Sequence, residues 1–117
     1  MRGLDAAFAA LFDPTRRRAI RLLIQGPRRA GELAADLDVR ASALTRHLRV
    51  LRESGFVEEQ REDGDARVRV YRLRREPLEA LRGWIDEVES FWSDQLASFQ
   101  RHVERRGARA NRSKARR

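Results

Sequence analysis

Two short amphipathic segments, separated by about three residues, occupy the middle of this chain. The first is AGELAADL at residues 30–37, and the second runs from about 41 to 53, before Ser54-Gly55. Apolar residues recur in both at the three- and four-residue spacings of a helix that covers a core. Two helices of this kind, the second amphipathic, are typical of a helix-turn-helix. Asp38 lies in the turn, where aspartate tolerates the left-handed conformation better than most residues.

The second segment separates into an apolar stripe and a polar face. The apolar stripe consists of Leu44, Leu48 and Leu51. The polar face spans an arc of about 100° on the other side of the helical wheel and consists of Ser42, Thr45, Arg46 and Arg49. A DNA-recognition helix needs this division, because its apolar stripe anchors it while polar side chains reach base edges or phosphates. An ordinary surface helix shows the same pattern, and the neighbouring helix, turn and charged hairpin favour recognition.

The segment before this pair predicts two further helices. Residues 4–12 place Leu4, Phe8 and Leu11 at helical spacing. Asp13-Pro14 then supplies an N-cap followed by proline at the first helical position. The second of these helices is expected to end at Gly26-Pro27, with arginines in its polar sectors.

From Phe56 onward the period of the sequence changes to that of strands. FVEEQRE and ARVRVYRLR alternate partially, and Asp63-Gly64-Asp65 between them is a turn signal, so a two-stranded hairpin is expected. The pattern leaves open which of Val70 and Tyr71 faces inward. Arginines flank the turn, where they could contact phosphates or a minor groove, or could protect the edge strands from pairing. The candidate DNA-binding residues are therefore Arg40, Ser42, Thr45, Arg46, His47, Arg49, Arg61, Arg67 and Arg69.

A long helix is predicted after Glu76-Pro77, over about residues 77–104. Some 26 residues would form a rod of roughly 40 Å, longer than so small a domain can cover by itself. Part of its apolar face should therefore pack on a second copy, together with the first helix. Aromatic residues here could instead line a small-molecule pocket, but at helical spacing they usually form core or interface. The predicted dimer interface comprises Phe8, Leu11, Phe12, Leu81, Ile85, Val88, Trp92, Leu96 and Phe99.

The net charge of +8 is unevenly distributed along the chain. Residues 105–117 hold 7 Lys and Arg without an acid, and we expect them to form a disordered basic tail after a domain at 1–104. Residues 13–52 carry 10 arginines against 4 acids, whereas residues 76–104 carry 2 basic against 7 acidic residues. This segregation indicates one surface for a polyanion and another for a different partner.

Other functional classes find little support in the sequence. Cysteine is absent, and His47 and His102 are the two histidines, so neither a disulfide framework nor a metal site is expected. No glycine-rich phosphate loop, nucleophile motif or oriented pair of acids indicates an enzyme or a cofactor. No signal peptide or membrane-spanning segment is seen, so a cytoplasmic protein without a membrane partner is expected.

Four motifs, taken as a set, resemble the ArsR-type winged-helix transcriptional repressors over about residues 4–100. They are DPTRR from Asp13, GELA from Gly31, RHLRVLRESG from Arg46 and VYRL from Val70. The resemblance implies a homodimer formed by the first and last helices, with residues 41–53 in the major groove and the hairpin as a wing. It also implies repression by occupying an operator, with release on a signal. Relatives that sense metals use cysteines or His and acidic pairs, so this chain resembles the non-metal-sensing members.

The sequence therefore predicts a mainly α protein with a small β-hairpin, an α+β winged helix-turn-helix. Its predicted function is sequence-specific binding of double-stranded DNA as a dimeric repressor on a near-palindromic operator, with an inducer that the sequence does not identify. The alternative is a helical interaction module that does not bind DNA and dimerises through residues 78–103.

Overall fold

Helices dominate the part of the chain that the structure, a computed structural model, describes, which is residues 2–115. The elements in chain order are α1 (Arg2–Leu11), α2 (Pro14–Ile24), β1 (Arg28–Arg29), α3 (Ala30–Leu37), α4 (Ala41–Glu53), β2 (Val57–Glu62), β3 (Asp65–Leu73) and α5 (Glu76–Ala115). They form two units, one ending at Arg82 and the other beginning at Gly83.

The first unit has one apolar core, to which all of its helices contribute. Its largest fully buried side chains are Phe56, Leu33, Leu37 and Leu51. Burial of a side chain of this size contributes about 1.5–3 kcal/mol relative to exposure. The core therefore combines α3, α4 and the segment that leads into β2, and holds α4 in place.

The predicted helix-turn-helix is confirmed. Helices α3 and α4 have the predicted bounds, and Asp38 between them has φ 53° and ψ 51°, in the left-handed region. The N–H groups of Asp38 and Val39 return to the carbonyls of Ala35 and Ala34, at 3.2 and 3.1 Å. This closure ends α3 and redirects the chain into α4.

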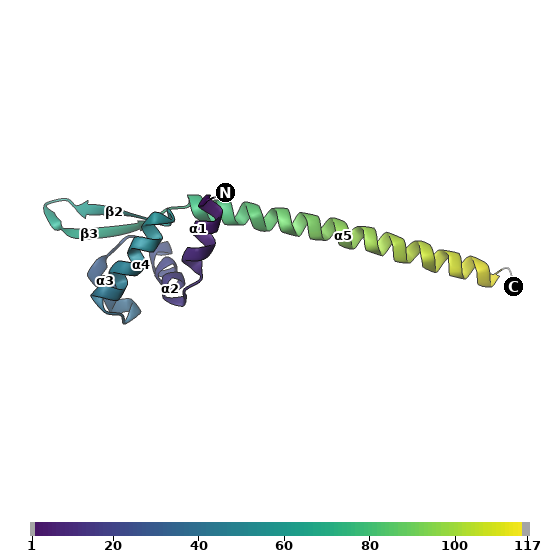
Figure 1. Ribbon diagram of the computed structural model, residues 1–117, viewed down its shortest axis with the longest axis horizontal. Helices are drawn as coiled ribbons and strands as arrows, with labels where there is room; N and C mark the ends of the chain where they lie inside the picture. Colours follow the sequence, from purple (N-terminus) through teal and green to yellow (C-terminus); the bar gives the residue numbers. More distant parts are fainter. Residues whose placement is uncertain (1, 116–117) are drawn as a thin grey trace. The chain divides into compact units, whose positions relative to one another are not determined.

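The hairpin is confirmed, with one addition. Strands β2 and β3 are antiparallel, and Figure 1 shows them extending from the helices as a hairpin. A third strand, β1, pairs with β3 through Arg28↔Tyr71 and Arg29↔Val70, giving the order β1-β3-β2. The sequence did not indicate β1, because two arginines carry no strand pattern. Tyr71, 5% exposed, is the inward-facing residue.

The second unit consists of α5 from Gly83 onward. The helix continues to Ala115, so the predicted disordered tail differs from the structure over residues 105–115, while 116–117 lie outside the described residues. Arginine and alanine are among the best helix formers, and Gly107 alone costs only about 1 kcal/mol. Once a long helix exists, each added residue also gains a hydrogen bond without a new nucleation cost.

Candidate nucleic-acid interface

Helix α4 buries its apolar stripe and exposes its polar face. Leu44, Leu48 and Leu51 are at most 3% exposed and belong to the core. The four polar residues on the opposite side are all exposed, and we call them the reading face: Ser42, Thr45, Arg46 and Arg49. Because the leucines anchor α4 in the core, the reading face on the opposite side remains accessible to a partner outside the unit.

The start of α4 is open. The helix begins at Ala41, and Arg40 is the N-cap residue, with extended φ and ψ of −67° and 148° and no side-chain capping bond. The first N–H groups of a helix have no intrahelical acceptor and favour an anion such as a phosphate. Arg40 is itself exposed beside them. The predicted contact residue therefore lies at an end of α4 that suits a phosphate.

Thr45 has a defined hydroxyl orientation. Its Oγ1 donates to the carbonyl of Ala41 at 2.8 Å. The proton is used within the helix, so the hydroxyl oxygen of this exposed residue remains as an acceptor. In this state Thr45 suits a donor such as a base amino group.

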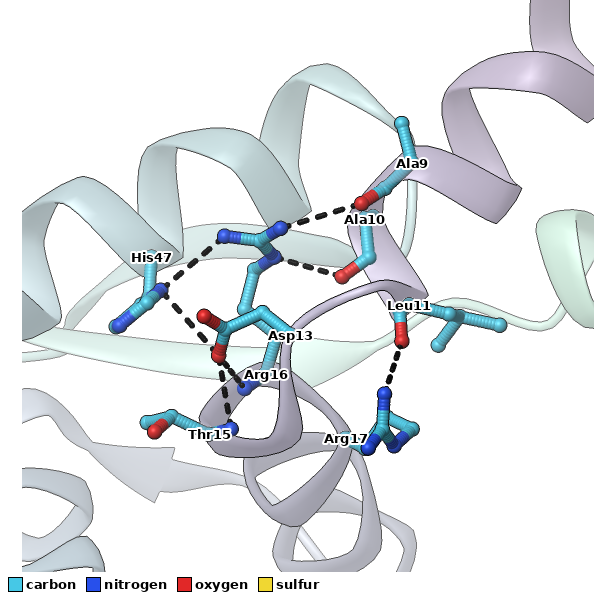
Figure 2. A network of polar contacts seen from close by, with 8 residues as sticks. All are labelled: Ala9, Ala10, Leu11, Asp13, Thr15, Arg16, Arg17 and His47. Carbon is cyan, nitrogen blue, oxygen red and sulfur yellow. Dashed lines mark hydrogen bonds and ion pairs between the residues drawn. The ribbon is translucent and has the colours of Figure 1, made fainter.

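A polar network connects α1, α2 and α4 (Figure 2). Asp13 caps α2, because its Oδ1 accepts from the N–H groups of Thr15 and Arg16 at 2.8 and 3.1 Å. The guanidinium of Arg16 donates to the carbonyls of Ala10 and Ala9, at 2.6 and 3.2 Å. These carbonyls belong to the last turn of α1, where that of Ala9 also accepts from the N–H of Phe12 at 3.2 Å. Arg16 therefore satisfies the end of α1 from the next helix.

The same guanidinium reaches α4. Its Nη1 lies 3.3 Å from Nδ1 of His47, and that nitrogen lies 4.0 Å from Oδ1 of Asp13 (Figure 2). The His47 side chain is 21% exposed. His47 was predicted to contact DNA, and the structure places its ring in this network at the margin of the reading face. Arg16, Arg46 and His47 also line an open hollow of about 350 Å³.

The network shifts the pKa of Asp13. Partial burial by itself would raise that pKa, but the N–H of Arg16, the charge of His47, the N–H of Thr15 and the guanidinium of Arg16 together outweigh it. The net result is a pKa below the ordinary value, which keeps Asp13 ionised as the N-cap of α2.

The predicted wing residues lie on β2 and β3. Arg61 and Arg69 are direct cross-strand partners, so their side chains leave the same face of the hairpin. Arg67 is also exposed, and it lies where the pairing of β2 with β3 shifts, between the pairs Arg61↔Arg69 and Glu62↔Asp65. Arg69 is also held by Glu59, a partner that the sequence did not reveal, because its position between strand residues gives no signal of a pairing across the sheet.

The predicted dimer residues fall into two groups. Phe8 on α1 is 42% exposed, and Phe12, directly after the end of α1, is 89% exposed. The apolar stripe of α5 is also exposed, between 45% and 65%, and comprises Ile85, Val88, Trp92, Leu96, Phe99 and Val103. Leu81 differs from prediction: it is 7% exposed and belongs to the core of the first unit, and Leu11 packs against that core. Leu81 and Leu11 have the same helical spacing as the interface residues, but they pack on the core of their own unit.

Two kinds of site find no support in the described residues. No described helix is long and apolar enough to span a membrane. Within the same part of the chain, no group of three or more His, Cys, Asp or Glu side chains could hold a metal ion.

Comparison with known proteins gives a consistent result. Residues 13–59 match the family of bacterial regulatory proteins named for arsR. The chain is 37% identical over 106 residues to the HTH-type transcriptional regulator Rv2034 of Mycobacterium tuberculosis, covering 91% of this chain and 94% of that protein.

Solved structures agree with this relationship. The crystal structure of the ArsR family transcriptional regulator RHA00566 is 32% identical, with a TM-score of 0.72 over 79% of this chain and 92% of that one. An ArsR-like transcriptional regulator from Rhodococcus sp. RHA1 is 28% identical, with a TM-score of 0.76 over 87% and 91% of the two chains. The chain therefore belongs to the ArsR family of winged-helix, DNA-binding transcriptional regulators, which are not enzymes.

Proposed function

We propose that the protein is a dimeric repressor that binds a near-palindromic operator, with α4 of each copy in the major groove. The observation that carries this proposal is the division of α4, whose leucines are buried and whose reading face is exposed. Arg46 and Arg49 are the residues that can read guanine, because a guanidinium donates two bonds to the O6 and N7 acceptors. Ser42 and Thr45 supply shorter contacts beside them.

Phosphate contacts complete the proposed interface. Arg40 and the open start of α4 would fix the register of the helix on the duplex, and Arg61 and Arg67 would do the same from the wing. Arg69 would contribute less, because it is already paired with Glu59. Contacts of this kind carry most of the affinity but little sequence information. Sequence discrimination is therefore assigned to the reading face.

Dimerisation is supported by the apolar stripe of α5. Side chains as large as Trp92 and Phe99 are 61% and 65% exposed in the single chain. A contiguous exposed apolar surface of this kind usually marks an interface. Phe8 of α1 and Phe12 directly after it are further candidates for contact with the second copy. Two recognition helices related by a two-fold axis would enter successive major grooves about 34 Å apart, which is why the operator should be near-palindromic.

Fluorescence anisotropy with DNA from upstream of the protein's own gene, compared with a random duplex of equal length, tests this function. We expect at least about a thousandfold preference for the specific site at physiological salt, and two copies of the chain bound per site. Equal affinity for both duplexes would overturn the proposal. It would favour the second candidate, an interaction module that uses the exposed stripe of α5 and does not bind DNA.

A further inference from the structure

Glu59 on β2 holds side chains from two neighbouring elements. Its Oε2 pairs with Nη1 of Arg52, at the end of α4, and its Oε1 pairs with Nε of Arg69, on β3, at 3.2 Å. The hydroxyl of Tyr71 on β3 donates to Oε2 at 3.4 Å. One carboxylate thus joins the end of the recognition helix to both strands of the wing.

The surroundings of Glu59 make this arrangement stable. Its side chain is 16% exposed, whereas those of Arg52 and Arg69 are 44% and 55% exposed. Burial and the charge of Glu59 raise the pKa of Tyr71, which keeps the phenol protonated as a donor. Because Tyr71 is part of the core, its hydroxyl fixes the carboxylate from the inner side.

The ion pairs change what Arg52 and Arg69 offer to a polyanion. A phosphate that binds either guanidinium must compete with a carboxylate already in contact with it. Arg67 on β3 is exposed, and its backbone N–H donates to Oδ1 of Asp65 at 3.0 Å. Arg67 and Arg69 on the wing therefore differ in how readily they can bind a phosphate. Arg69 must first leave Glu59.

We propose that Glu59 is a specificity-determining and positioning residue that restrains Arg52 and Arg69 from binding phosphate on DNA of any sequence. Non-specific affinity depends on how many cations engage phosphates, whereas specificity is the difference between two affinities. Restraint of two arginines lowers affinity for random DNA. The contacts of the reading face of α4 then determine which DNA sequence the protein prefers. This inference rests on the proposed function of operator binding.

Glu59→Gln tests the inference, with Glu58→Gln as the matched control. Glu58 precedes Glu59 on β2, and its carboxylate accepts a hydrogen bond from Gln60 at 3.3 Å. Both variants remove one negative charge from the same strand. Affinity for random and operator DNA is measured by anisotropy at several salt concentrations, after thermal unfolding has shown that both variants fold.

We expect Glu59→Gln to bind random DNA about tenfold more tightly than the wild type does. Glu58→Gln should change the affinity for random DNA less than about threefold. The slope of log affinity against log salt should steepen by about 0.9 for each arginine that gains a phosphate. The preference for operator over random DNA should fall at least about fivefold for Glu59→Gln. Adding Arg52→Gln and Arg69→Gln should remove the extra slope, which a purely structural effect of Glu59 would not produce.

A second pair of variants keeps the inference testable if Glu59→Gln does not fold. Arg67→Gln should weaken binding to random DNA more than Arg69→Gln, because Arg69 is already neutralised. Equal behaviour of Glu59→Gln and Glu58→Gln, or a larger loss for Arg69→Gln than for Arg67→Gln, would overturn the inference. A wild-type protein without preference for the operator would instead overturn the proposed function itself.

Discussion

Helices α4 and α5 are both amphipathic, yet they leave opposite faces exposed. In α4 the apolar stripe is at most 3% exposed, and the arginines face outward. In α5 from Gly83 onward the apolar stripe itself is exposed, between 45% and 65%. The same helical pattern therefore serves two purposes. The face that the chain's own core does not cover is the face available to a partner, polar for α4 and apolar for α5.

Trp92→Glu should have the largest effect, because it places a charge in the middle of the apolar stripe of α5. A buried aromatic residue at the centre of an interface typically contributes 2 kcal/mol or more, so we expect the dimer dissociation constant to rise at least about 30-fold. Sedimentation equilibrium measures this directly. Ser90→Glu adds the same charge on the opposite side of α5 and should leave the dimer intact. A dimer equally stable in both variants would contradict the role of the stripe.

Arg46→Ala and Arg49→Ala test the polar side of the comparison. Each should lower operator affinity about 10- to 100-fold, since a bidentate contact to guanine discriminates by about 1–3 kcal/mol. Circular dichroism should show an unchanged fold, because both side chains are exposed. Arg18→Ala, which removes an exposed arginine from α2, is the control and should change affinity less than about threefold. If all three variants bind alike, the reading face is not the DNA-binding surface.

Arg16→Lys tests whether the contacts of the Arg16 guanidinium with α1 and α4 stabilise the fold. Lysine has one compact ammonium group and cannot reach the carbonyls of Ala9 and Ala10 together with His47. We expect the free energy of unfolding to fall by about 1–2 kcal/mol in urea titrations, because the partly buried carbonyl of Ala10 loses its donor. Arg18→Lys, at an exposed position on the same helix, should change it by less than about 0.5 kcal/mol. An unchanged free energy of unfolding for Arg16→Lys would show that the contacts of Arg16 with Ala9, Ala10 and His47 do not stabilise the fold.

Asp13→Asn should have the smallest effect, and it depends on pH. Asparagine caps a helix as well as aspartate does, so this variant removes only the charge. Because the folded pKa of Asp13 lies below its unfolded value, the charge stabilises the fold above the unfolded pKa. That contribution is lost as the pH falls through the folded value. The free energy of unfolding of the wild type should exceed that of the variant by about 0.3–1 kcal/mol at pH 7, and the difference should shrink as the pH falls below the unfolded pKa. A difference independent of pH would contradict the ionic contribution.

The sequence predicted local features well. The bounds of α3 and α4, the left-handed Asp38 and the cap by Asp13 each depend on residues close together in the chain. Their spacing and backbone preferences are visible in the sequence itself. The division of α4 into buried leucines and an exposed reading face was predicted for the same reason.

Features that depend on contacts between distant residues were missed. Strand β1 forms because the backbone of Arg28 and Arg29 pairs with β3. Glu59 forms ion pairs with Arg52 and Arg69, which lie on two other elements. Arg16 was placed on a polar sector of α2, although its guanidinium serves the carbonyls of α1 and the ring of His47. Leu81 has the spacing of an interface residue but lies in the core. Periodicity identifies a face, and the packing of the whole unit decides what covers it.

In-vitro selection from a random DNA pool, followed by footprinting of the selected sequence, would show whether two copies of α4 read DNA together. We predict one enriched near-palindrome, with two protected half-sites about 34 Å apart and two chains bound. Arg46→Ala should lose the enrichment, and Trp92→Glu should lose the paired protection. A pool without an enriched sequence, or a single half-site bound by one chain, would contradict the proposal that α4 reads DNA while α5 pairs the copies.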